Sequence, residues 1–294
     1  MSGFGEIKNL TSILSPDIAV ITNIGISHVE TLGSKENILK AKLEVVKGLK
    51  DNGKIILNGD DEMLYAQKDK LSHEIIYYGI YNENVDYRAE NIRSEGEKGV
   101  YFDIVISDKK HTIHVPAPGE HNVYNALSGI AVGKLLDLHI SDIKYGIKNF
   151  SLGSMRLNIL SINGIKIIND SYNASPDSMF AAINVLDEIS GDNRKIAILG
   201  DMLELGEFAM DAHMEVGRFA FSKKIDYIIT VGKMGKYIAK GAITAGADSS
   251  KVISFEDVSS VKDFISKFVQ KSDVILIKGS RGMKMEGIIS EYGL

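Results

Sequence analysis

The sequence of 294 residues contains no cysteine and only four prolines. Without cysteine the chain can form no disulfide, no thiolate nucleophile and no cysteine-ligated metal site, which fits a reducing compartment. No stretch approaches the roughly 20 apolar residues that a membrane-spanning helix needs, and the N-terminus has neither a basic leader nor an apolar core. We therefore expect a cytoplasmic location and no membrane partner.

Excess positive charge is also missing. The chain has 34 Lys plus Arg against 39 Asp plus Glu, a formal net charge of −5. A nucleic-acid surface needs clustered positive charge, so no nucleic-acid partner is expected. An anionic nucleotide is still a possible ligand, because a bound metal and a few basic side chains can reverse the local field.

A third absence concerns phosphate binding. The chain contains no Gly-x-x-x-x-Gly-Lys-Ser/Thr loop, the motif with which enzymes of the phosphate-loop class hold a triphosphate. The composition, 44% hydrophobic and 25% charged, is that of a folded α/β protein long enough for two domains. The residues alone therefore indicate an α/β protein with a possible metal and nucleotide site.

The hydrophobic pattern changes near residues 150–156. Before it, residues 18–24 (IAVITNI) predict a buried parallel strand, and residues 75–115 show the alternation of half-exposed antiparallel strands. After it, strands alternate with helical segments, which is typical of βαβ units in a doubly wound sheet. The predicted strands of this second half are IKIIND, KIAILGD, DYIITVG and DVILIKG.

Lys42 is the most informative single position. Ser34 is predicted to cap a helix that runs to about Leu49, and Lys42 falls in the middle of its apolar face, which is formed by Ile38, Val45, Val46 and Leu49. One interpretation is a lysine whose stem packs on the core while its ammonium reaches water. The other is a desolvated amine held beside a substrate or a metal.

Other polar residues follow predicted strands or begin a helix. His28 lies just beyond the strand at 18–24, and with Lys42 it suggests a metal or phosphate site. Asn122 and Asn125 share one face near the start of a predicted helix, where they could cap it or contact a purine edge. Asn58 and Asp60 are weaker candidates of the same kind.

Three predicted strands of the second half end in polar or flexible residues. These are residues 169–173 (NDSYN), residues 200–202 (GDM) and residues 278–281 (KGSR). Ligands of open α/β sheets gather at this carboxyl edge, where loops and helix N-termini meet. We expect the second half to contribute its functional residues there.

Several short motifs, taken in order, resemble the Mur ligase family, and among its members the ligases that add D-alanyl-D-alanine to a peptidoglycan precursor. The motifs are GEI, TNIGISHVETLGS with AKLE, GEHNVYNAL, Arg156, NDSYNASPDSM, GDMLELGE with His213, and KGSRGMKME. The resemblance implies an incomplete central ATPase-type mixed-sheet domain at residues 1–152, without the phosphate loop. A Rossmann-like doubly wound domain would follow at residues 153–294.

The resemblance also implies a reaction and roles for residues. ATP would phosphorylate the carboxylate of UDP-N-acetylmuramoyl-tripeptide, and D-alanyl-D-alanine would attack the acyl phosphate, with two Mg²⁺ ions offsetting charge. His28 would coordinate one magnesium ion and Lys42 would be carbamylated to stabilise it. On the nucleotide side, Asn122 and Asn125 would lie against the adenine, Arg156 near the phosphates and Asp170 at the ribose. The C-terminal side of the cleft would be lined by Tyr172, Asn173, Lys278, Ser280 and Arg281.

The chain departs from the family pattern at its start. Family members carry a UDP-sugar domain, the phosphate loop and a magnesium-binding glutamate before the position that Met1 matches. We therefore expect a truncated chain that is inactive on its own; turnover of ATP with tripeptide and dipeptide by the purified chain would overturn this.

Three other interpretations remain open at this stage. The chain could belong to another ligase of the superfamily, such as a folylpolyglutamate synthase, that accepts a different acid and amine. It could be a non-catalytic module that binds a nucleotide or a peptide. Lys42 and His28 could also be purely structural, in which case Lys42→Met would leave ligation by an intact enzyme unchanged.

Overall fold

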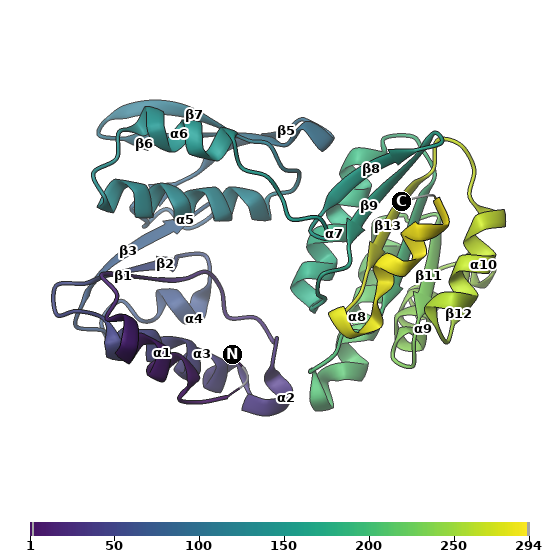
Figure 1. Ribbon diagram of the computed structural model, residues 1–294, viewed down its shortest axis with the longest axis horizontal. Coiled ribbons are helices and arrows are strands. Elements are labelled where there is room, and N and C mark those ends of the chain that lie inside the picture. Colours follow the sequence, from purple (N-terminus) through teal and green to yellow (C-terminus); the bar gives the residue numbers. More distant parts are fainter. Residues whose placement is uncertain (2, 293–294) are drawn as a thin grey trace. The chain divides into compact units, whose positions relative to one another are not determined.

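The computed structural model describes residues 1 and 3–292, with side chains up to residue 289. The chain separates into two units, Met1–Ser151 and Leu152–Leu294 (Figure 1). Within the described residues, the first unit contains two sheets and the second contains one, and each unit has its own buried core. No helix in the described part of the chain combines the length and the apolar character needed to cross a lipid bilayer.

The first unit is built on a parallel four-stranded sheet in the order β1-β2-β3-β4. The strands are β1 (Ile18–Ile21), β2 (Lys54–Asn58), β3 (Glu74–Gly79) and β4 (Tyr87–Arg88). Consecutive residues of β2, Ile55 to Leu57, are all fully buried, so both faces of the central strand are covered, as is usual for parallel sheets. β1 ends at Ile21, earlier than the predicted residue 24.

A second, antiparallel sheet consists of β5 (Glu90–Ser94), β6 (Val100–Ile106) and β7 (Lys109–Val115). In β6 the buried Ile104 and Ile106 flank the exposed Val105, which confirms the predicted half-exposed strands. The prediction was wrong for β3, which pairs in parallel with β2. Its run of buried residues carries no alternation that would distinguish the two arrangements.

The helices of the first unit include one whose second half is not α-helical. Ser34 caps α3 as predicted, accepting a hydrogen bond from the Asn37 N–H at 3.2 Å. The α-helix ends at Lys42, however, and continues as the 3₁₀ helix η1 (Leu43–Gly48). A 3₁₀ helix turns by about 120° per residue rather than the roughly 100° of an α-helix. The predicted apolar face is therefore wrong for the residues after Lys42, and Val45 is only half buried. The α-helices are α1 (Glu6–Leu14), α2 (Val29–Leu32), α3 (Lys35–Lys42), α4 (Glu62–Tyr65), α5 (His121–Leu135) and α6 (Ile140–Lys148).

The second unit contains a six-stranded sheet in the order β12-β11-β10-β13-β9-β8. All neighbours are parallel except β8 and β9. The four predicted strands are present, whereas the two edge strands β8 and β12 were not predicted because their short, half-exposed sequences give little signal. The strands are β8 (Asn158–Ile162), β9 (Ile165–Asp170), β10 (Lys195–Gly200), β11 (Tyr227–Val231), β12 (Val252–Phe255) and β13 (Val274–Lys278).

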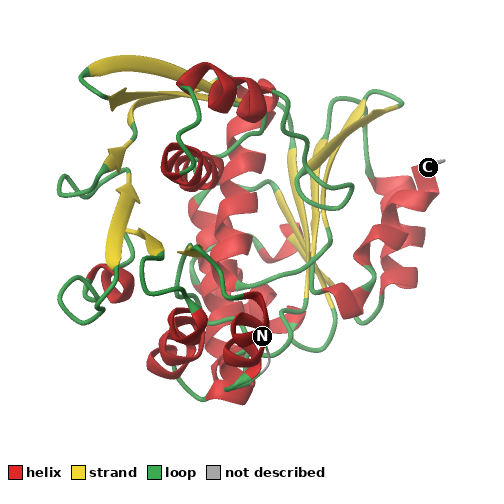
Figure 2. Ribbon diagram, turned by 60° about the vertical axis from the view of Figure 1, so that its left-hand side comes forward, coloured by secondary structure: helices red, strands yellow, loops and turns green. Residues whose placement is uncertain are grey.

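Helices cover both faces of this sheet (Figure 2). On one face, Val261 and Ile265 of α10 pack with Ile288 of the 3₁₀ helix η6 against inward side chains of the strands. α7 contacts β13 and α8, and α8 packs closely on α9. The unit therefore has the doubly wound, Rossmann-like arrangement that its alternating sequence predicts. The helices are α7 (Pro176–Ser190), α8 (Ala209–Ser222), α9 (Gly235–Thr244), α10 (Val258–Phe268) and η6 (Met285–Tyr292).

Candidate functional site

In the first unit, Lys42 reaches the loop that follows β1. Its Nζ donates a hydrogen bond to the Asn23 carbonyl oxygen at 2.6 Å, and its side chain is half buried. His28 belongs to the same loop and adopts a left-handed backbone with φ 64° just before α2, a conformation that few residues other than Gly, Asn, Asp and His adopt readily. The structure thus anchors Lys42 on the loop that carries His28.

Asp61, which the sequence analysis did not single out, fixes this loop from the end of β2. One carboxylate oxygen caps α4 through the N–H groups of Met63 and Leu64, both at 3.0 Å. The other accepts the Ile24 N–H at 2.6 Å. Asp61 directly precedes α4, where aspartate is a common N-cap residue, so its capping role could be predicted from the sequence. Its contact with Ile24 could not, because that contact depends on the order of the strands in the sheet.

The Asp60 carboxylate joins the turn after β3 to α5. Its carboxylate accepts the N–H groups of Ile80 and Asn82 at 2.6 and 2.7 Å and the Tyr124 hydroxyl at 2.8 Å. Burial opposes ionisation of Asp60, but these donors outweigh it, so the pKa of Asp60 lies below its usual value. Asn58 accepts the Asp60 N–H at 3.0 Å, which forms a tight turn after β2 and places Asn58 beside a structural carboxylate.

Asn122 and Asn125 form a directed pair of amides on α5. Asn122 is buried, and its Nδ2 donates to the Pro118 carbonyl oxygen at 2.7 Å. Since that oxygen can only accept, the orientation of the Asn122 amide is fixed. Its Oδ1 accepts a hydrogen bond from the Asn125 Nδ2 at 3.1 Å. Asn122 therefore does not cap α5, and Asn125 is left with its Oδ1 as an acceptor for which the described residues provide no donor.

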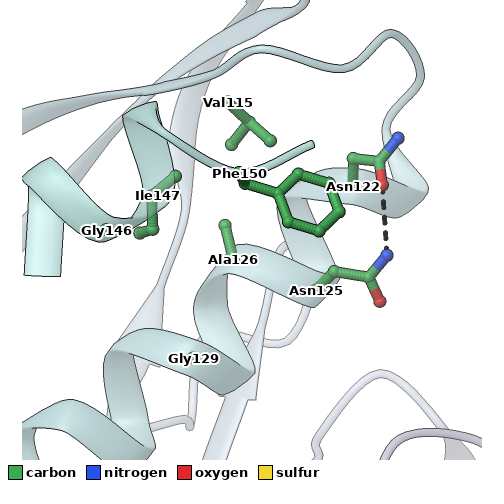
Figure 3. Close-up of a pocket in the computed structure, with 8 residues that line it drawn as sticks. All are labelled: Val115, Asn122, Asn125, Ala126, Gly129, Gly146, Ile147 and Phe150. Atoms are coloured by element: carbon green, nitrogen blue, oxygen red, sulfur yellow. Dashed lines mark hydrogen bonds between the residues drawn. The ribbon is translucent and has the colours of Figure 1, made fainter. Parts of the chain in front are cut away.

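A pocket of about 230 Å³ lies beside these two amides. Figure 3 shows the Phe150 ring next to them, and the remaining wall is mostly apolar. A flat aromatic wall combined with an oriented amide suits a planar heterocycle better than a flexible chain. Phe150 had no signal in the sequence, because only the packing of α6 on α5 brings it to the pocket. The lining residues are Val115, Asn122, Asn125, Ala126, Gly129, Gly146, Ile147 and Phe150.

In the second unit, a buried lysine joins two strands at the carboxyl edge. Lys278, the last residue of β13, lies opposite Asp170, the last residue of β9. Its Nζ is 2.5 Å from Asp170 Oδ2 and donates to the Asn173 carbonyl oxygen at 2.9 Å. Only 2% of Lys278 is exposed. Burial lowers the pKa of its ammonium, and the Asp170 carboxylate opposes that shift.

Arg156 and Tyr172 lie at the same edge of this unit. The guanidinium carbon of Arg156 lies over the Tyr172 ring, 4.2 Å from its centroid. The backbone on either side of Arg156 is also held: the Met155 carbonyl accepts the Tyr172 N–H at 3.1 Å. The Leu157 N–H donates to Asp170 Oδ1 at 3.1 Å. Asp170 thus connects Lys278 with the segment that carries Arg156.

The remaining predicted residues of this unit mainly fix loops. The buried Ser280 accepts the Leu203 N–H through its hydroxyl at 2.9 Å. Arg281 pairs with Glu286 at 2.7 Å and is half exposed. His213, fully buried, accepts the Met202 N–H at 2.9 Å through Nε2 while its Nδ1 contacts the Ala209 carbonyl at 2.6 Å. Burial lowers the pKa of His213, which keeps the imidazole neutral and able to accept.

The comparison with known protein families follows the two units. Residues 1–133 match the Mur ligase middle domain, and residues 155–281 match the Mur ligase glutamate ligase domain. Together the two models cover most of the chain. The chain belongs to the Mur ligase family.

Curated relatives include a particular ligase of that family. The chain is 39% identical over 292 residues to the UDP-N-acetylmuramoyl-tripeptide--D-alanyl-D-alanine ligase of Bacillus subtilis (strain 168), covering 99% of this chain and 62% of the relative. Identity to the Escherichia coli (strain K12) ligase of the same name is 32%, over 97% of this chain and 62% of the relative. The chain therefore spans a little under two thirds of these relatives.

Solved structures agree with this likeness. MurF from Acinetobacter baumannii superposes with a TM-score of 0.90 at 27% identity, covering 99% of this chain and 63% of that one. The MurF ligase from Thermotoga maritima in complex with ADP gives a TM-score of 0.84 at 25% identity, covering 99% and 65%. Both units thus have the fold of the corresponding parts of MurF.

Proposed function

We propose that this chain is the nucleotide-side and C-terminal portion of an ATP-dependent amide ligase. The reaction would join D-alanyl-D-alanine to UDP-N-acetylmuramoyl-tripeptide in the synthesis of peptidoglycan precursors in the cytoplasm. The observation that carries this proposal is the 39% identity to the Bacillus subtilis ligase over nearly the whole chain. It favours this acid and amine over the glutamate and folate substrates of a folylpolyglutamate synthase.

The proposed chemistry is an activation followed by an acyl transfer. The γ-phosphate of ATP would pass to the tripeptide carboxylate, giving ADP and an acyl phosphate. The dipeptide amine would then attack the acyl carbon, so that an amide bond forms while phosphate leaves and the amine loses a proton. Exclusion of water from the acyl phosphate is essential, because hydrolysis would waste it.

The adenine of ATP would occupy the pocket beside Asn122 and Asn125. The support is the direction of the hydrogen bonds: Pro118 orients Asn122, Asn122 orients Asn125, and Asn125 presents an oxygen. An oxygen acceptor matches the exocyclic amine of adenine and opposes the carbonyl that inosine or guanosine carries at the same position. The Phe150 ring would stack on the base.

Magnesium and the modification of Lys42 belong to the same proposal. Among the described residues no group of three or more His, Asp or Glu side chains is arranged to hold a metal ion, and an ammonium cannot act as a ligand. These residues as they stand do not fit a magnesium site. Carbamylation would turn Lys42 into an anionic oxygen ligand beside the loop that carries His28. Labelling with ¹³C-bicarbonate should then give a carbamate signal in the ¹³C NMR spectrum, and Lys42→Arg should remove that signal. A labelled chain without a carbamate signal, or a signal that survives Lys42→Arg, would exclude carbamylation of Lys42.

Nucleotide selectivity tests the proposal on the chain itself. We expect ATP to bind about five- to tenfold more tightly than inosine triphosphate. The inosine carbonyl oxygen and Asn125 Oδ1 are both acceptors, so they would face each other with no hydrogen bond between them. Asn125→Leu removes the acceptor and should make the two affinities equal. NMR titrations that follow the Asn125 side-chain amide and the backbone amides of α5 provide the measurement.

Asn84→Leu is the matched control, because Asn84 is an exposed asparagine in a loop of the same unit. It should keep the preference for ATP. Equal binding of both nucleotides by the unmodified chain, or shifts that avoid the pocket, would rule out the adenine assignment.

A further inference from the structure

The guanidinium of Arg156 is held in place but uses none of its hydrogen-bond donors within the described part of the chain. Its contact is with the face of the Tyr172 ring, at 4.2 Å. Arg194 and Arg281 of the same unit differ, because each pairs with a carboxylate, Asp273 and Glu286 respectively. Arg156 is exposed at the surface of the unit, so its N–H groups are accessible to a ligand.

Stacking determines which part of the guanidinium is available. The group is planar, and all five N–H bonds lie in its plane. An arginine that lies flat on an aromatic ring has one face covered and keeps its edges open for two parallel hydrogen bonds to an oxyanion. The Tyr172 hydroxyl forms no hydrogen bond with any described residue, so the contribution of this side chain comes from its aromatic ring.

The backbone of the same segment is fixed on both sides of the arginine. Met155 accepts the Tyr172 N–H, and the Leu157 N–H binds the Asp170 carboxylate. The segment that carries Arg156 is therefore tied to Tyr172 by one main-chain hydrogen bond, and to the Asp170 side chain by the Leu157 N–H. Preorganisation of this kind lowers the entropy lost when a ligand binds.

The local charge favours an anion. Burial lowers the pKa of Lys278, and the nearby positive charge of Arg156 acts in the same direction. Asp170 is the carboxylate that pairs with Lys278. None of the described carboxylates forms an ion pair with Arg156, which leaves positive charge at the exposed guanidinium. Among common anions, phosphate oxygens match the paired N–H groups of arginine in geometry and charge.

We propose that Tyr172 is a positioning residue whose ring holds the Arg156 guanidinium flat, with its N–H edge directed to bind the phosphate oxygens of a polyphosphate chain. This inference rests on the proposed function, in which the polyphosphate belongs to ATP. It assigns to the exposed tyrosine a role that requires an aromatic ring and no hydroxyl.

The test uses the side-chain Nε–Hε signals of arginine in the full 294-residue chain. Only six arginines are present, and Arg156→Lys identifies the signal of Arg156. Inorganic tripolyphosphate, added without metal, should shift this signal saturably. Tyr172→Phe should keep the affinity within about twofold, and Tyr172→Leu should weaken it about two- to fivefold, the size expected for an exposed cation–π contact.

Tyr145→Leu is the control for loss of an exposed tyrosine, because Tyr145 is 72% exposed on α6; it should bind as the unmodified chain does. Melting temperatures of all variants separate a loss of binding from a loss of folding. An Arg156 signal that tripolyphosphate leaves unmoved overturns the proposal, and so does a Tyr172→Leu chain that binds with unchanged affinity. Equal binding of ATP and inosine triphosphate by the unmodified chain, together with an intact tripolyphosphate response, would instead refute the proposed function alone.

Discussion

Replacing Lys278 by methionine is expected to lower the free energy of unfolding of the second unit by about 3–5 kcal/mol. The lysine is almost fully buried, and the Asp170 side chain beside it is only 14% exposed. Methionine fills a similar volume but leaves the carboxylate without its cation and the Asn173 carbonyl without its donor. Most of the cost is therefore the desolvation of groups that have lost their partner.

The matched control is Lys50→Met in the first unit. Lys50 pairs with Asp17 at 2.7 Å, but their side chains are 48% and 73% exposed, so water replaces the lost contact and a change of about 1 kcal/mol or less is expected. Urea unfolding followed by the amide signals of β9 and β13 measures the second unit separately. An equal, small effect of both substitutions would show that Lys278 does not hold the carboxyl edge together.

The second large effect is expected from Gly217→Ala. Gly217 lies where α8 crosses α9, and a Cβ at this position would be 1.9 Å from the Ile238 carbonyl oxygen. The opposing Gly241 is equally close to the backbone of α8, with 2.0 Å to the Met214 carbonyl oxygen. A backbone atom cannot rotate away as a side chain can, so the two helices must separate. We expect a loss of about 3 kcal/mol, the upper part of the range for overpacked cores.

Gly146→Ala provides the opposite case within a helix. A Cβ on Gly146 of α6 would meet no heavy atom within 4 Å, so alanine should stabilise the first unit by up to about 1 kcal/mol through its higher helix propensity. Thermal unfolding monitored by the amide signals of each unit distinguishes the two outcomes. A Gly217→Ala chain as stable as the unmodified one would show that α8 and α9 are not in tight contact.

Features that depend on local sequence were predictable. The Ser34 cap follows from a hydroxyl before a helical run, and the buried strands β10, β11 and β13 follow from continuous apolar segments. The polar residues after these strands indicated the carboxyl edge where Lys278 and Asp170 meet. The pairing itself was not predictable, because it requires β13 to lie between β10 and β9 although it comes last in the chain.

Features that depend on packing or on hydrogen-bond direction were not predictable. The change from α to 3₁₀ helix after Lys42 leaves no mark in the periodicity, and it shifted the predicted apolar face. Phe150 reaches its pocket only through the packing of α6 with α5. The spacing of Asn122 and Asn125 placed both on one face, but only the Pro118 carbonyl determines which amide atom is presented.

The central claim, that this chain serves an ATP-dependent ligase for D-alanyl-D-alanine, is tested most directly by ligation in a chimera. The chain would replace the 292 matched residues of the Bacillus subtilis ligase, and the product formed from tripeptide and dipeptide would be measured with the ADP released. We expect ATP-dependent joining of D-alanyl-D-alanine, no addition of glutamate, and loss of activity on Lys42→Met. A chimera that folds and binds ATP but forms no such product, or one that prefers glutamate, would contradict the claim.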